Sequence, residues 1–219
     1  MNVLVVSNPD SRAEFKSKFG SKHSVCFKSC HEINGEDVKT AEIIFDFEVT
    51  ENRLHGKLYH ENPQAILLVN TVKTTLVGLV KSYNWEHTTV GFNGFPGMFN
   101  RPLLELTTQD GNMSVVQEIC NQLNSEYRIV EDRIGMVTPR VICMIINEAF
   151  YTVQEGTAQE PDIDLAMKLG TNYPSGPFEM AKTIGLRHIY ELLEAIHQDT
   201  GEERYKICPL LKKRFVVEQ

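Results

Sequence analysis

Short apolar runs alternate with amphipathic segments through the first 131 residues of the chain. The runs are rich in β-branched residues, which is typical of strands buried in a parallel sheet. They predict strands at residues 3–6, 24–27, 42–47, 65–70, 88–92, 103–108 and 127–130. Between them, the helical period predicts helices at residues 11–19, 53–60, 73–83 and 113–123. Strands and helices that alternate in this way indicate a doubly wound α/β sheet.

After Gly135 only the helical period remains. Apolar side chains repeat every four positions from Val137 to Ala149, which predicts one face of a helix over residues 137–153. Further helices are predicted after Pro161, after Pro177 and over residues 187–200, where Gly201 is placed as a left-handed cap. We therefore expect a sheet domain at residues 1–134 and an all-helical domain at residues 135–219.

Composition and charge exclude several classes of protein. The 219 residues carry a formal net charge of −7, which opposes binding to nucleic acid because that binding depends on neutralising phosphates. The five cysteines are odd in number and scattered, so we expect reduced thiols and no metal site. The N-terminus has no basic region typical of a signal peptide, and no run approaches the roughly 20 apolar residues of a membrane helix. A cytoplasmic protein that does not contact a membrane is expected.

Residues 162–185 read DIDLAMKLGTNYPSGPFEMAKTIG. In the words A-M-K-L-G and Y-P-x-G-P-F-E and in the G-L that follows, this segment resembles the C-terminal helical domain of 3-hydroxyacyl-CoA dehydrogenases. The resemblance continues at lower density through the first half. It implies a truncated Rossmann-like domain before the helical one, NAD as the cofactor and an acyl-CoA or CoA-like ligand. It also implies a homodimer formed through the C-terminal helices.

The turn that should hold the cofactor departs from the family pattern. Family members bind NAD on a glycine-rich turn after the first strand, where the backbone approaches the pyrophosphate. Here Ser7, Asn8 and Pro9 occupy that turn, no glycine is present, and proline removes an N–H group. Asp10 would face the anion with a negative charge, and it is interpreted as a helix cap. Only residues 7–41 separate the first strand from the EIIFDF run, so the family's helical arm is predicted to be absent.

The catalytic positions that the resemblance implies are mostly replaced. Asn70 of the family's Asn-Thr word is kept, but Val72 stands where the family has Ser. Asn93 stands at the position of the family's general base, a His. Twelve residues later comes Glu105, which matches the family's orienting carboxylate. Pro139 replaces an Asn in the first long helix, so only Glu105 remains of the four polar catalytic positions.

These replacements predict an impaired or inactive dehydrogenase. A carboxamide such as Asn93 does not serve as a general base, and losing such a base typically lowers the rate by about 10²–10⁴. Two alternatives stay open. The chain could be an active 3-hydroxyacyl-CoA or 3-hydroxybutyryl-CoA dehydrogenase with a rearranged site and Glu105 as base. It could also be a structural or regulatory partner without catalysis.

Residues 91–102 read GFNGFPGMFNRP, a run rich in glycine, proline and phenylalanine between two predicted strands. The plain interpretation is an irregular connecting loop. A sharper one is a loop over the cleft, in which Phe92, Phe95, Met98 and Phe99 line a path for an acyl chain or pantetheine arm. Asn70, Phe92 and Phe95 are therefore candidate substrate-binding residues.

Three histidines lie close to these segments in the sequence. His55, His60 and His87 are interpreted as surface residues. None of them has a position that would let it replace the missing base.

Overall fold

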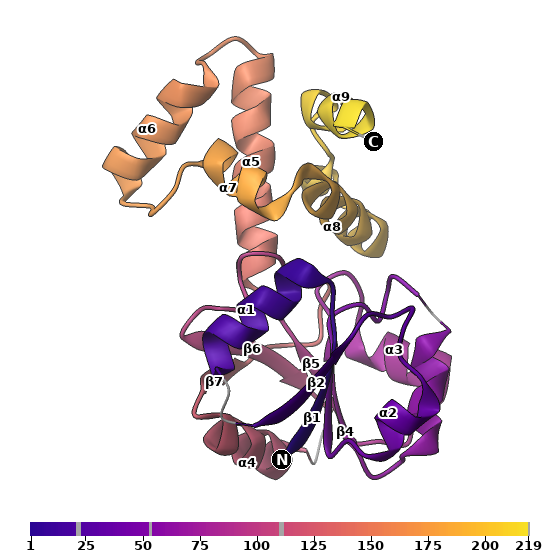
Figure 1. Ribbon diagram of the computed structural model, residues 1–219. Coiled ribbons are helices and arrows are strands. Elements are labelled where there is room, and N and C mark those ends of the chain that lie inside the picture. The colour runs from indigo at the N-terminus through magenta and orange to yellow at the C-terminus, as the bar shows by residue number, and fades with distance from the viewer. Residues whose placement is uncertain (21–22, 53, 110–111, 219) are drawn as a thin grey trace. The chain divides into compact units, whose positions relative to one another are not determined.

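The computed structural model describes residues 1–20, 23–52, 54–109 and 112–218, which form two compact units, Met1–Met136 and Val137–Gln219 (Figure 1). The first unit contains a seven-stranded sheet and the second contains helices. The predicted fold class, a doubly wound α/β sheet followed by a helical domain, is confirmed.

Each of the seven predicted strands is present in the sheet. They are β1 (Asn2–Val6), β2 (Ser24–Lys28), β3 (Ile43–Asp46), β4 (Ile66–Asn70), β5 (Thr89–Phe92), β6 (Leu103–Thr108) and β7 (Glu126–Ile129). Their order is β2-β1-β3-β4-β5-β6-β7, and the only antiparallel pairing among the described strands is that of β5 with β6. The chain leaves β1 for β2 on one side and returns to β3 on the other. The gap between β1 and β3 is therefore the topological switch point of the sheet.

Helices cover both faces of the sheet. Val3 and Val5 of β1 point toward α1 (Pro9–Phe19) and α4 (Met113–Leu123), whereas Leu4 and Val6 pack toward α2 (Gly35–Lys39), η1 (His55–Glu61) and α3 (Leu76–Tyr83). The alternation follows from the two-residue period of a strand. The predicted helix at residues 53–60 is the 3₁₀ helix η1, and its predicted first residue, Arg53, lies outside the described residues. The five-residue helix α2 was not predicted because it is too short to show a period.

The helical unit contains α5 (Thr138–Gln154), α6 (Glu160–Thr171), α7 (Pro177–Ile184), α8 (Leu186–Thr200), η2 (Glu203–Tyr205) and α9 (Pro209–Glu218). The four predicted helices are confirmed, and Gly201 caps α8 in the left-handed region with a φ of 66°. The apolar repeat that predicts α5 does not mark its buried side at the start, because Val137 and Val141 are 51% and 50% exposed. The buried stripe instead runs through Ile142, Ile146 and Phe150.

The word Y-P-x-G-P-F-E has a packing reason inside this unit. The Asp164 carboxylate on α6 accepts hydrogen bonds from the first-turn N–H groups of Phe178 and Glu179, at 2.8 and 3.2 Å. A Cβ on Gly176 would lie 2.3 Å from that carboxyl group, so only glycine allows this close approach. The Glu179 side chain accepts a bond from the Gly176 N–H at 3.0 Å. This word therefore fixes the entry of α7 against α6.

Candidate active site

The predicted site residues gather at one edge of the sheet. Because β1, β3, β4 and β5 are parallel, their carboxyl ends meet at the same edge. Ser7 and Asn8 follow β1, Asn70 ends β4, and Asn93 follows β5. Strand β6 runs in the opposite direction and brings Glu105 to Asn93. The structure thus places residues that are far apart in sequence along one edge.

The turn after β1 uses its polar groups to cap α1. The Asn8 side chain accepts a hydrogen bond from the N–H of Ser11 at 2.9 Å, and the Asn8 carbonyl accepts one from Arg12 at 3.0 Å. Pro9 has no N–H group. Three backbone positions at the start of α1 therefore have no free N–H for a phosphate. The cap is Asn8, and the interpretation of Asp10 as the cap is wrong, since Asp10 lies in the first helical turn.

Replacing Asn8 by Ala should lower the free energy of unfolding by about 1 kcal/mol, because α1 loses its N-cap. Urea unfolding followed by circular dichroism measures the change. Asn8→Asp is the matched control and should retain most of the stability, since Asp caps as well as Asn. Equal losses in both variants would count against the capping role.

The Asn70 side chain ties the ends of three strands together. Its Nδ2 group donates to the carbonyls of Phe47 and Gly94, both at 3.4 Å, and its Oδ1 accepts from the N–H groups of Val72 and Gly94 at 3.3 and 3.2 Å. A carboxamide has two N–H donors and one oxygen with two lone pairs, so these bonds use its full capacity. Val72, at the position of the family's Ser, is fully buried.

Asn93 and Glu105 are neighbours across the β5–β6 pair. The Asn93 N–H donates to the Glu105 carbonyl at 3.0 Å, and their side chains belong to residues that are only 5% and 8% exposed. The Asn93 side-chain oxygen accepts a bond from the Phe95 N–H at 3.1 Å. The carboxamide therefore bonds to its own loop. The spacing of twelve residues brings the two positions together as the resemblance implies, but their chemical roles stay predictions.

The four apolar side chains of residues 91–102 lie in the core of the sheet unit. Phe92, Phe95, Met98 and Phe99 are all buried. The Phe99 ring lies 4.8 Å from that of Phe47 and 5.4 Å from that of Phe92, both at steep angles. Such edge-to-face contacts are typical of a packed aromatic core. The proposed role of these residues in lining a ligand path is still a prediction.

The same loop is held along α1 by hydrogen bonds. The Glu14 carboxylate accepts from the N–H groups of Gly97, Phe99 and Asn100 at 2.8, 3.1 and 3.3 Å. One turn later, Ser17 accepts from the Asn100 side chain at 2.9 Å. Bonds to a charged acceptor are stronger than neutral ones, so they fix the loop against the helix.

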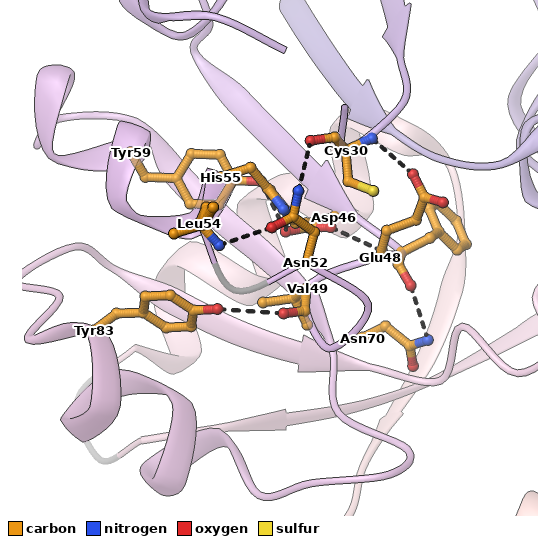
Figure 2. Close-up of polar contacts among 12 residues, drawn as sticks. Cys30, Asp46, Glu48, Val49, Asn52, Leu54, His55, Tyr59, Asn70 and Tyr83 are labelled. Atoms are coloured by element: carbon orange, nitrogen blue, oxygen red, sulfur yellow. Dashed lines mark hydrogen bonds and ion pairs between the residues drawn. The ribbon is translucent and has the colours of Figure 1, made fainter. Parts of the chain in front are cut away.

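A buried polar cluster at the end of β3 was not predicted from the sequence (Figure 2). Asp46 is the last residue of β3, and one of its carboxylate oxygens lies 2.8 Å from Nε2 of His55 and accepts from the Tyr59 hydroxyl at 2.7 Å. The other oxygen accepts from the Glu48 N–H at 2.8 Å. Since His55 and Tyr59 both belong to η1, this cluster fixes η1 to the sheet.

The environment of this cluster shifts two pKa values. Burial of the imidazole opposes its protonation, but the hydrogen bond and the negative charge of Asp46 outweigh burial and raise the pKa of His55. Burial, followed by the charge of Asp46, raises the pKa of Tyr59 well above its ordinary value. The Asp46 carboxylate thus favours the protonated form of the His55 imidazole and disfavours the ionised form of the Tyr59 hydroxyl.

Three histidines were interpreted as surface residues, and for two of them this interpretation is wrong. His55 is buried against Asp46. His87 is also buried, with Nε2 at 3.0 and 3.1 Å from the carbonyl oxygens of Tyr59 and Asn62. His60 is exposed, as predicted. No local pattern marks the buried pair, because their partners lie 9 and 28 residues away in the sequence.

The described parts of the chain also lack two kinds of feature. No group of three or more His, Cys, Asp or Glu side chains there could hold a metal ion. Among the same residues, no helix has the length and apolar character needed to cross a membrane.

Comparison with known families identifies the helical unit. Residues 135–218 match the family model described as 3-hydroxyacyl-CoA dehydrogenase, C-terminal domain. A 3-hydroxybutyryl-CoA dehydrogenase of Bradyrhizobium diazoefficiens is 27% identical over 190 residues, which cover 81% of this chain and 64% of the relative. A probable 3-hydroxybutyryl-CoA dehydrogenase of Bacillus subtilis is 32% identical over 155 residues, which cover 69% of this chain and 54% of the relative. The chain thus spans less than two thirds of the length of either relative.

The fold of the whole chain also has solved counterparts. The crystal structure of M. tuberculosis FadB2 superimposes with a TM-score of 0.81 and covers 99% of this chain and 94% of that one. The two are 17% identical, so this likeness concerns the fold alone.

Proposed function

Since the chain belongs to the 3-hydroxyacyl-CoA dehydrogenase family, we propose that it is a member in which NAD-dependent oxidation of 3-hydroxyacyl-CoA is lost or strongly impaired. One observation carries the proposal. The polar side chains at the carboxyl edge of the sheet, which would serve ligands, bond instead to the chain's own backbone. Asn8, Asn70 and Asn93 all do so.

The residues at the expected cofactor site fit NAD poorly. A pyrophosphate needs free N–H groups at the start of a helix and a close approach of the backbone. In the turn after β1, Pro9 has no N–H group. The N–H of Ser11 already donates a hydrogen bond to the Asn8 side chain, so it is not free for a phosphate. Asp10 adds a negative charge in the first turn. No step of a mechanism is therefore assigned to this cofactor.

The catalytic positions support the same proposal. Oxidation of a 3-hydroxyl group requires a base that takes its proton while hydride leaves. Asn93 has no such basicity, and its oxygen already accepts the Phe95 N–H. Val72 offers no hydroxyl, and Pro139 lies in the first turn of α5 with no amide side chain. Glu105 is the remaining polar group of the four.

An assay of NADH oxidation with acetoacetyl-CoA tests the proposal. We expect kcat/KM to lie at least about 10²–10⁴ below that of a 3-hydroxybutyryl-CoA dehydrogenase measured alongside, since the general base is missing. Residual turnover should be the same in Glu105→Gln. Turnover comparable to that relative, and abolished by Glu105→Gln, would instead establish an active enzyme with a rearranged site.

Residual binding of a CoA-like ligand separates the remaining alternatives. Thermal shift measurements with CoA, acetyl-CoA and NAD are suited to this question. A ligand at 100 times its dissociation constant stabilises the fold by about 2.7 kcal/mol. A shift with CoA or acetyl-CoA favours a ligand-binding protein, whereas no shift with any of the three favours a structural or regulatory partner.

A homodimer through the C-terminal helices is part of the proposal. Leu165 and Leu169 on α6 and Val216 and Val217 on α9 are exposed apolar side chains. Apolar surface that is exposed in a single chain can be removed from water by contact with a second copy. We expect sedimentation to give twice the mass of the chain, and Leu169→Glu together with Val217→Glu to give the monomer. A wild-type monomer would remove the homodimer from the proposal. The predicted cytoplasmic location is kept as an expectation.

A further inference from the structure

The segment that follows β3 crosses the carboxyl end of β1. The Glu48 carboxylate accepts a hydrogen bond from the Cys30 N–H at 2.9 Å, and the Asn52 side chain donates to the Cys30 carbonyl at 3.4 Å (Figure 2). Cys30 follows β2, and Glu48 and Asn52 follow β3. Because β1 lies between β2 and β3, these two bonds span the end of β1. Residues 47–52 are called the strap below.

The strap is also fixed on its other sides. The Phe47 carbonyl accepts from the Asn70 side chain at 3.4 Å, on the side of β4. The Val49 carbonyl accepts from the Tyr83 hydroxyl at 3.3 Å, on the side of α3 (Figure 2). Bonds therefore run from the strap to segments beside β2, β4 and α3, and the strap lies over the middle of the carboxyl edge.

This position coincides with the ligand crevice expected of the sheet. In open α/β sheets of order 2-1-3-4-5, ligands bind outside the carboxyl ends of the strands, at the switch point between the first and third strands. Glu48 follows β3 at that point and is buried. Burial, followed by the negative charge of Glu48, raises the pKa of Cys30 to about 11, as expected of a thiol held against a buried carboxylate.

We propose that the strap is an autoinhibitory element, in which the Glu48–Cys30 bond holds a carboxylate across the switch point and excludes adenine nucleotides. The negatively charged phosphates of a nucleotide in the crevice would meet this buried negative charge. Like charges placed together in this way oppose binding strongly. The strap is proposed to act on nucleotide binding and not on hydride transfer. It is therefore tested with ADP, which has no nicotinamide and cannot take part in that reaction.

Calorimetric titration with ADP tests the strap. Glu48→Ala should bind ADP at least about tenfold more tightly than the wild type, because both the charge and the bond to Cys30 are removed. Glu36→Gln is the matched control, since it removes one negative charge at an exposed position of the same unit, and it should change the affinity by less than about twofold.

Hydrogen exchange of the Cys30 N–H gives an independent readout. Its protection should fall in Glu48→Ala, where the acceptor is gone. If Glu48→Ala does not fold, Glu48→Gln, which removes the negative charge and keeps the size of the side chain, takes its place and should also bind ADP more tightly than the wild type. A folded Glu48→Ala or Glu48→Gln variant that binds ADP no better than the wild type would overturn the proposal.

Discussion

Replacing Asp46 by Asn should lower the free energy of unfolding of the sheet unit by about 3–5 kcal/mol, the range measured when one partner of a buried ion pair is removed. The Asp46 and His55 side chains are almost fully buried, and Tyr59 bonds to the same carboxylate oxygen. The variant leaves the imidazole without its counter-charge in a site that water does not reach. Urea unfolding followed by tryptophan fluorescence is a suitable measurement, since Trp85 packs in the same core as Tyr59.

The pH dependence of the same experiment identifies the cause. The pKa of His55 is raised in the folded state, so the stability that its protonation contributes is complete below the unfolded pKa of about 6.5. That contribution is lost as the pH rises through the higher folded value. The wild type should therefore lose stability as the pH rises above about 6.5, and Asp46→Asn should lose less over the same rise.

A control separates the buried pair from surface charge. Glu36 pairs with Lys39 on the exposed side of α2, so Glu36→Gln should change the stability by less than about 1 kcal/mol. A loss of under about 1 kcal/mol in Asp46→Asn itself would show that the cluster does not anchor η1.

Replacing Phe99 by Ala should lower the free energy of unfolding by about 3–5 kcal/mol, as for other large-to-small changes in cores. The Phe99 ring is buried and contacts the rings of Phe15, Phe47 and Phe92. Its removal would leave a cavity where the loop 91–102 meets α1 and the sheet. Urea unfolding measures the change.

The neighbouring Asn100 provides the comparison. It is exposed and bonds to Ser17, so Asn100→Ala should lower the stability by only about 0.5–1.5 kcal/mol. If Phe99→Ala lost no more than Asn100→Ala, the loop would not belong to the core. Phe92, Phe95 and Phe99 would then again be candidates for lining a ligand path.

Most of the fold follows from the hydrophobic pattern because the central strands are short, continuous apolar runs. Residues 65–70 illustrate this, since the run AILLVN predicts β4 to within one residue. Short elements escape such reasoning. Helix α2 has five residues and is set by Asn34, whose side chain caps its first turn. The apolar repeat of α5 does not identify its buried side because apolar residues occur on more than one side of this helix, and only packing selects the buried one.

The site was predictable where it depends on sequence spacing and not where it depends on tertiary contacts. The resemblance placed Asn93 and Glu105 together, and the β5–β6 pair brings them side by side. The Asp46 cluster could not be foreseen, because Asp46 lies within an apolar strand and His55 is in a polar stretch. Only the docking of η1 on the sheet brings the two groups within 2.8 Å.

We propose above all that the crevice between the ends of β1 and β3 does not accept NAD. A crystal structure of the protein grown with millimolar NAD tests it most directly. We predict that the crevice contains the strap with Glu48 bonded to the Cys30 N–H, and no dinucleotide. A dinucleotide bound there, with its pyrophosphate at the start of α1 beside Asn8 and Pro9, would contradict the claim.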